Sequence, residues 1–185
     1  MIKITFVTCN NTKLLDAQNI FSLDDIEIIG KNIDLQEIQS QDQKEIIKYK
    51  AQLAFNLIKG PTIVDDTCFY INSYPGFPGT LTKYVNLLLG LDAFLRLYDE
   101  GQRAYFQTML CYKDFSNEII TEGSLEGRLT KNRSKIINKD TPLNSIFIPK
   151  GFNEPLIELP EELGLRNIHR IKALKELKKA LTETL

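Results

Sequence analysis

The sequence has no tryptophan, one histidine and only three cysteines among its 185 residues. Cys9, Cys68 and Cys111 are odd in number and far apart, so their spacing excludes the paired cysteines of a zinc site or a redox loop. We expect them to be reduced thiols in the cytoplasm. Because His169 is the only histidine, a serine or cysteine triad has one possible base, and no nucleophile motif accompanies it. We therefore discount nucleophilic catalysis.

Long apolar runs and a strong net charge are also missing. No stretch approaches the roughly 20 apolar residues that span a bilayer, and the N-terminal MIKITFVTCN lacks the long apolar core of a signal peptide. The formal net charge is −1, which gives no global attraction for nucleic acid. The basic run from Lys131 to Lys135 is typical of a solvated loop. We expect neither a membrane nor a nucleic acid as partner.

The order of apolar and polar segments predicts an α/β fold, with residues 1–185 forming a single domain. Strands are expected at 2–8, 26–33, 62–64, 104–112, 118–128 and 145–148, and helices at 13–21, 42–58, 81–97 with a break near Gly90, and 169–181. The two longest strands would form a hairpin, which together with the alternating strands and helices indicates a mixed sheet.

Two adjacent acids, Asp65 and Asp66, are expected at the C-terminal end of the strand at 62–64. Two carboxylates about 4 Å apart at a surface repel by about 4 kcal/mol, so a positive group is expected nearby. Acids at a strand end often only cap the next turn. Asp65, Asp66 and Glu37, which is in the loop after the second strand, form a set of carboxylates without cysteine or histidine. Such a set suits Mg²⁺.

Two basic residues occupy unusual helical positions. Lys50 lies inside the apolar stripe of the helix at 42–58, so either its stem packs while the ammonium reaches water, or its charge is directed at a polyanion. Arg170 begins the apolar face of the last helix. Its acceptor is either a structural carboxylate or a ligand phosphate or carbonyl.

The loop from Thr8 to Lys13 connects a strand to a helix. Free backbone N–H groups and the helix dipole favour anions at such a position. The loop lacks the glycines of a Walker A sequence, and an ordinary capped turn is the more common meaning. Taken alone, it is a weak candidate for a phosphate site.

Three segments carry a family resemblance, and the similarity extends nearly from end to end. The first is Thr8-Cys9-Asn10-Asn11-Thr12-Lys13, which resembles a Thr-Gly-Asn-x-x-Lys loop with Cys9 replacing glycine. The second is Asp34-Leu35-Gln36-Glu37, which resembles Asp-Leu-x-Glu. The third is Asp65-Asp66-Thr67 followed by Gly76-Phe77-Pro78-Gly79 and Lys83. The third resembles a Glu/Asp-Asp-Thr/Ser segment with Gly-x-Pro-Gly and a lysine. The chain thus resembles the inosine triphosphate pyrophosphatases, a family of noncanonical purine nucleoside triphosphate pyrophosphatases.

This resemblance implies an elongated α/β domain with a long, twisted mixed sheet flanked by helices, usually as a homodimer. It implies Mg²⁺-dependent cleavage of a nucleoside triphosphate between the α and β phosphates, which yields a monophosphate and pyrophosphate. By the same resemblance, the substrate would be bound by Thr8, Asn10, Lys13, Lys50, Thr67, Lys83, His169 and Arg170. Glu37 and Asp66 would bind the metal, Asp66 would act on water, and Asp65 would be an additional ligand or a supporting acid.

The part that resembles the base-recognition region departs from the family pattern. Thr141 to Ser145 stand where the family has Phe-Gly-Tyr/Trp-Asp-Pro, and Gly164 to Arg170 retain only His169-Arg170 of Lys-Asn-x-x-Ser-His-Arg. Losing an aromatic stacking partner corresponds to roughly 1–3 kcal/mol per base. Three functions remain open: a pyrophosphatase, a noncatalytic nucleotide-binding or interaction protein, and a phosphohydrolase with another substrate. Arg166 or Lys150 are possible substitutes for the lost lysine.

Overall fold

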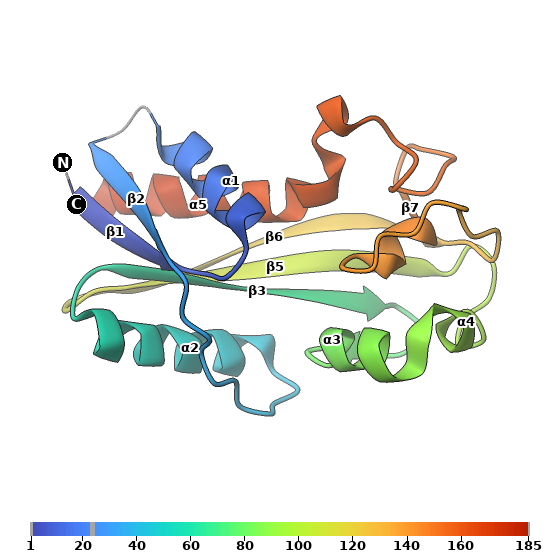
Figure 1. Ribbon diagram of the computed structural model, residues 1–185, viewed down its shortest axis with the longest axis horizontal. Helices are drawn as coiled ribbons and strands as arrows, with labels where there is room; N and C mark the ends of the chain where they lie inside the picture. The colour runs from blue at the N-terminus through green and yellow to red at the C-terminus, as the bar shows by residue number, and fades with distance from the viewer. Residues whose placement is uncertain (1, 23–24, 185) are drawn as a thin grey trace. The chain divides into compact units, whose positions relative to one another are not determined.

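The computed structural model describes residues 2–22 and 25–184. They form an α/β fold with a seven-stranded mixed sheet in the order β2-β1-β3-β5-β6-β7, and β4 pairs with β3 outside this path (Figure 1). β1 is parallel to both β2 and β3, whereas β4 and β7 are antiparallel to β3 and β6. The expected α/β class with a mixed sheet and flanking helices is confirmed.

The contacts divide the chain into two compact units. The first contains the residues up to Asp66, Thr108–Gly123 and the residues from Arg170 onward, and the second contains Thr67–Gln107 and Ser124–His169. The expected organisation of residues 1–185 as a single domain stays a prediction.

Five helices and seven strands make up most of the regular structure of the described chain. The strands are β1 (Ile2–Val7), β2 (Ile26–Lys31), β3 (Thr62–Ile71), β4 (Pro78–Gly79), β5 (Arg103–Lys113), β6 (Glu118–Leu129) and β7 (Phe147–Pro149). The helices are α1 (Asn11–Phe21), α2 (Gln43–Ile58), α3 (Thr82–Tyr84), α4 (Gly90–Phe94) and α5 (Ile168–Thr184), with a π-helical segment at Val85–Leu89 and 3-10 turns at Pro142–Ser145, Glu161–Leu163 and Leu165–Asn167. None of the helices in residues 2–22 and 25–184 has the length and apolarity that crossing a membrane requires.

Side-chain caps explain where the two helices of the N-terminal half begin. The Asn10 side chain accepts hydrogen bonds from the backbone N–H groups of Thr12 and Lys13, at 2.9 and 3.2 Å. The Asp42 side chain accepts from Lys44 N at 2.8 Å. Both caps satisfy N–H groups that the first turn of a helix leaves without partners. They set the starting points of α1 and α2, and therefore the directions from which Lys13 and Lys50 extend.

The first unit has two apolar clusters that use alternate residues of the same strands. Phe6 of β1 and Ile63 of β3 pack with side chains of α1 and α5. The next residues, Val7 and Val64, pack with side chains of α2. Because successive side chains of a strand point to opposite faces, α1 and α5 cover one face of the sheet in this unit and α2 covers the other.

The core of the second unit is rich in aromatic rings. Phe147 of β7 contacts the rings of Phe69 and Phe106, with centroids 5.8 and 5.0 Å away. Phe94 of α4 and Leu143 of the 3-10 turn belong to the same cluster. This core therefore joins β3, β5, β7 and the helices that follow β4.

β4 was not expected from the sequence, β2 ends two residues earlier than expected, and two other strands have different bounds that matter here. β3 continues to Ile71, so Asp65 and Asp66 lie inside a strand and not at its end, as the sequence suggested. Residues 67–71 are mostly aromatic or β-branched, and charged partners of the two acids come from distant segments, which the local pattern does not reveal. At 145–148 the strand starts later, because the Ser145 hydroxyl donates to Pro142 O at 2.6 Å and closes a 3-10 turn.

Gly79 provides a direct test of the turn before α3. Its φ is +53°, and an added Cβ would lie 2.3 Å from the carbonyl oxygen of Gly76. Because a backbone atom cannot be displaced cheaply, we expect Gly79→Ala to lower the free energy of unfolding by about 1–3 kcal/mol or more. The measurement is urea denaturation.

The matched control for this substitution is Gly60→Ala. An added Cβ at Gly60 meets nothing within 4 Å, so its denaturation midpoint should stay near that of the wild type. Equal midpoints for the two variants would contradict the steric account of Gly79.

Candidate functional site

The two acids of β3 lie on opposite faces of the sheet. Asp65 lies on the same face of β3 as Ile63, which is covered by α1 and α5. Asp66 lies on the same face as Val64, which is covered by α2. This alternation separates the two carboxylates. The repulsion expected from their adjacency in the sequence is therefore reduced by the strand itself.

Asp65 is the buried centre of a group of charges in the first unit. Its side chain is only 4% exposed, and its Oδ2 forms an ion pair with Lys13 Nζ at 2.7 Å. Its backbone carbonyl accepts a hydrogen bond from Lys50 Nζ at 3.0 Å. Two lysines from different helices thus meet at one residue of β3.

The protonation of Asp65 reflects two opposed effects. Burial by itself raises the pKa of the carboxyl group, but the attraction of Lys13, with smaller contributions from Lys50 and Arg170, holds that pKa below its ordinary value. The group is therefore a carboxylate at neutral pH, and its negative charge is balanced by the surrounding cations.

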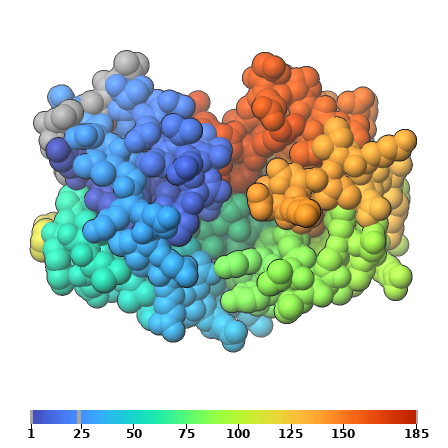
Figure 2. Space-filling model, in the orientation of Figure 1, coloured from blue at the N-terminus to red at the C-terminus, as the bar shows by residue number. Residues whose placement is uncertain are grey.

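Lys50 is the charged residue on the apolar stripe of α2, and its ammonium group is bound rather than free in water. It donates to Glu37 Oε1 at 2.8 Å, and its side chain is 13% exposed. Burial lowers the pKa of Lys50, but the negative charges of Asp66, Glu37 and Asp65 outweigh that effect and raise it. Glu37 lies in the surface loop between β2 and α2, coloured light blue in Figure 2, and Lys50 ties this loop to β3.

Asp66 has a partner that the sequence did not suggest. The buried Gln43, in the first turn of α2, donates through Nε2 to both Asp66 Oδ2 at 3.0 Å and Asp66 O at 3.1 Å. This amide positions the carboxylate. A glutamine in the first turn of a helix is ordinary, so no local signal distinguishes it.

Arg170 forms a buried ion pair with Asp16. Arg170 Nε donates to Asp16 Oδ2 at 2.9 Å, and the two side chains are 10% and 12% exposed. Of the two acceptors that the sequence allows for Arg170, the structure has the carboxylate. Asp16 lies 154 positions away along the chain, so its role was not visible in the sequence.

The other predicted site residues are Thr8 and Asn10 in the first unit and Thr67, Lys83 and His169 in the second. Thr8 Oγ1 accepts from Asn10 N at 3.2 Å, and Asn10 caps α1, so the loop has the capped turn that was the simpler alternative. Thr67, Lys83 and His169 belong to the second unit. There, Lys83 is exposed on α3 and the buried His169 stacks on Phe106 with centroids 5.7 Å apart. Their contacts with substrate stay predictions.

The segments that depart from the family pattern are part of the second unit's core. Leu143 is buried in the aromatic cluster, and Ile168 packs against it. Arg166 pairs with Glu161 and donates to Ile157 O at 2.8 Å. These residues therefore have structural roles within their own unit.

The acids of the first unit do not form a complete metal cage by themselves. Among residues 2–22 and 25–184, no group of three or more His, Cys, Asp or Glu side chains is arranged to hold a metal ion. Glu37 is paired with Lys50, and Asp66 is bonded to Gln43.

Comparisons with known proteins agree on one family. The model of the Ham1 family matches residues 4–180. A dITP/XTP pyrophosphatase from Thermococcus kodakarensis is 29% identical over 100% of both chains, and an inosine triphosphate pyrophosphatase from Puccinia graminis f. sp. tritici is 31% identical over 96% of this chain and 95% of its own. The structure of a HAM1 protein from Coxiella burnetii has a TM-score of 0.83 at 21% identity, covering 99% of this chain and all of that one.

The lowered pKa of Asp65 leads to a pH-dependent contribution to stability. A carboxyl group whose pKa is lower in the folded state adds stability that is present above the unfolded pKa, about 3.9, and is lost as the pH falls through the folded value. We expect the free energy of unfolding to decrease as the pH is lowered beneath about 4. The dependence of this free energy on pH should be weaker in Asp65→Asn. Urea denaturation at a series of pH values measures both slopes.

The control for the pH series is Asp140→Asn, because Asp140 is exposed. This variant should keep the wild-type slope. A wild-type slope in Asp65→Asn would show that the ion pair does not contribute to the acid sensitivity.

Proposed function

The chain belongs to the Ham1 family, and from that premise we propose that it is a nucleoside-triphosphate pyrophosphatase. It hydrolyses noncanonical purine nucleoside triphosphates to the monophosphate and pyrophosphate. The observation that carries this proposal is the meeting of Lys13 and Lys50 at Asp65, next to Asp66. The names of the dITP/XTP pyrophosphatases that match nearly the whole chain support the same activity.

The two lysines bind the triphosphate by exchanging partners. Lys13 and Lys50 are each paired with a carboxylate, at 2.7 and 2.8 Å. Phosphate oxygens replace these carboxylates as acceptors, so that neither lysine is left without a counter-charge. This matters because an unpaired charge in a buried position costs several kcal/mol, roughly 3–5 when one partner is removed. Lys83 adds a third positive charge in this proposal.

Glu37 and Asp66 are the proposed ligands of Mg²⁺. Their oxygens suit a hard cation, and Mg²⁺ usually takes one or two protein carboxylates together with substrate phosphates and water. The absence of a three-residue metal group among the described residues fits an ion that arrives with the nucleotide. When bound, the ion supplies neutralisation of the phosphate charge.

Asp66 is the proposed base. It accepts a proton from the attacking water while the water oxygen bonds to phosphorus and the α–β anhydride bond breaks, with pyrophosphate as the leaving group. The Gln43 amide holds the carboxylate by Oδ2 and by the adjacent carbonyl. Asp65 positions Lys13 before the nucleotide binds, and His169 and Arg170 contact the base. We also expect a homodimer, as the resemblance implies, and a location in the cytoplasm, as the isolated cysteines suggest.

The competing function is nucleotide binding without hydrolysis. It is favoured by the second unit, where Leu143 of the diverged segment is buried in the core and offers no aromatic wall. This change affects the selection of the base. It leaves the lysines and acids of the first unit unchanged, so we prefer the enzyme.

Pyrophosphate release tests the proposal directly. Purified protein is incubated with Mg²⁺ and a panel of ITP, dITP, XTP, dUTP and the ordinary nucleoside triphosphates. We expect turnover of the inosine and xanthosine compounds, and a rate at least about 100-fold lower in Asp66→Asn, because a general base contributes about 10²- to 10⁴-fold. The exposed Asp99→Asn is the matched control and should keep the wild-type rate.

Two outcomes of this experiment separate the candidate functions. Turnover no higher than that of Asp66→Asn would remove the enzyme proposal. If calorimetry then detects nucleotide binding without pyrophosphate release, the noncatalytic relative is the correct alternative.

Removal of the metal gives a separate prediction. We expect EDTA to abolish pyrophosphate release and added Mg²⁺ to restore it. Glu37→Gln should need a higher Mg²⁺ concentration for the half-maximal rate, because one charged ligand becomes neutral. Full activity in EDTA would contradict the assignment of Glu37 and Asp66 as metal ligands while leaving hydrolysis itself intact.

A further inference from the structure

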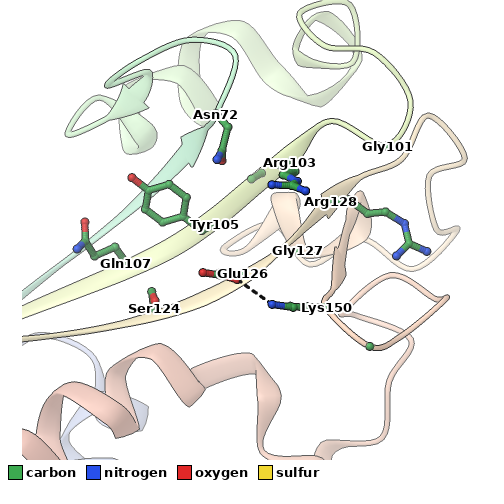
Figure 3. Close-up of a pocket in the computed structure, with 12 residues that line it drawn as sticks. Asn72, Gly101, Arg103, Tyr105, Gln107, Ser124, Glu126, Gly127, Arg128 and Lys150 are labelled. Atoms are coloured by element: carbon green, nitrogen blue, oxygen red, sulfur yellow. Dashed lines mark hydrogen bonds and ion pairs between the residues drawn. The ribbon is translucent and has the colours of Figure 1, made fainter.

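A hollow of about 570 Å³ lies on the second unit, over β5 and β6 (Figure 3). Its volume lies within the range of roughly 300–1,000 Å³ that small-molecule sites occupy. The residues that line it are Asn72, Gly101, Arg103, Ala104, Tyr105, Gln107, Ser124, Glu126, Gly127, Arg128, Lys150 and Gly151. The proposed hydrolysis uses none of them.

The pairing of β5 with β6 places two arginines directly opposite each other. Leu129 N donates to Gln102 O at one end of the hairpin, and Asp114 N donates to Asn117 O at the other. Both bonds fit one antiparallel register of the two strands, and in that register Arg103 lies opposite Arg128. Side chains in such a pair have Cβ atoms about 4.5–5.5 Å apart, and like charges there destabilise the sheet.

Few negative charges compensate this arginine pair. Among residues 2–22 and 25–184 neither arginine takes part in an ion pair, and Arg128 has only a long contact of 3.5 Å to Asn153 Oδ1. Glu126 is the one acid in the lining, and it contacts Lys150 at 3.5 Å with both side chains largely exposed. The lining therefore has three positive charges and one negative charge.

The other walls of the hollow suit an organic group. Tyr105 stacks on Tyr70 with centroids 4.9 Å apart and 18° between the rings. The amides of Asn72 and Gln107 flank it, and Figure 3 shows the side chains of Tyr105 and Glu126 on neighbouring strands. The hollow thus combines an aromatic surface, neutral hydrogen-bonding groups and a concentration of positive charge.

We propose that this hollow binds a phosphate-bearing small molecule, with the phosphate group between Arg103, Arg128 and Lys150. A phosphate accepts paired hydrogen bonds from guanidinium groups and offsets the repulsion between the two arginines. A polar sheet face in contact only with water is common, but it does not require two unpaired arginines directly opposite each other. None of the residues that line the hollow is among the proposed hydrolytic residues.

Binding is tested on the full-length, ¹⁵N-labelled protein by NMR, in buffer without divalent metal. The probes are inorganic phosphate and AMP. We expect both to shift the backbone amide signals of Gly101, Gly127 and Gly151, with AMP also shifting Tyr105. The double variant Arg103→Gln/Arg128→Gln should weaken binding at least tenfold, while Arg96→Gln, which removes an exposed arginine of the same unit, should bind as the wild type does.

Stability provides a second measurement. Because it removes a repulsion, the double variant should melt at or above the wild-type temperature in buffer without phosphate, and phosphate should raise the melting temperature of the wild type more than that of the double variant. Lys150→Gln changes an exposed residue and should weaken binding several-fold, which keeps the test valid if the double variant fails to fold.

Three results would overturn the proposal. The first is a phosphate response that is the same in the wild type and in the variants. The second is a response confined to residues 8–13, which would assign phosphate only to the proposed hydrolytic site. The third is a wild type that does not respond to phosphate together with a double variant that sediments differently from it. This result would identify the face as an interface between copies of the chain. Loss of NTP hydrolysis in the earlier assays would not affect any of these measurements.

Discussion

The buried carboxylate of Asp65 is the interaction on which the polar part of the first unit depends. An isolated ion at this depth would be strongly unfavourable, and the attraction of Lys13, Lys50 and Arg170 compensates for burial. Lys13 lies in α1, Lys50 in α2, and Arg170 in α5. One strand residue therefore contacts lysines from two helices and attracts the arginine of a third, so these basic groups are already ordered around it before any ligand binds.

The strand that carries Asp65 also separates the functions of the two adjacent acids. Asp65 faces the lysine of α1, whereas Asp66 faces the amide of Gln43 in α2. In the proposed reaction the first acid positions a cation before the nucleotide binds, and the second acts on water and metal. Neither role needs the two carboxylates to share a space, because the alternation of side chains in β3 directs them to opposite faces.

The positive charges at the two proposed sites are of two kinds. Lys13, Lys50 and Arg170 have carboxylate partners at 2.7 to 2.9 Å, so a ligand must compete with those partners. Arg103 and Arg128 are placed opposite each other in a hairpin and have no ion-pair partner among the described residues. Binding of an anion therefore has different consequences at the two places: exchange of partners in the first unit, and relief of repulsion in the second.

The sequence alone determined the α/β class, most of the helices and strands, and the identities of Lys13, Lys50, Glu37, Asp65 and Asp66 as candidates, because periodicity, caps and motifs are local. It also identified Lys50 and Arg170 as charges on apolar faces. Only the tertiary structure decided which partners these charges have. Gln43 and Asp16 reach Asp66 and Arg170 from positions 23 and 154 residues away, and β3 continues past the two acids to Ile71. Contacts between residues so far apart in the sequence cannot be predicted from a local pattern, because ordinary side chains make them once the sheet and helices have packed.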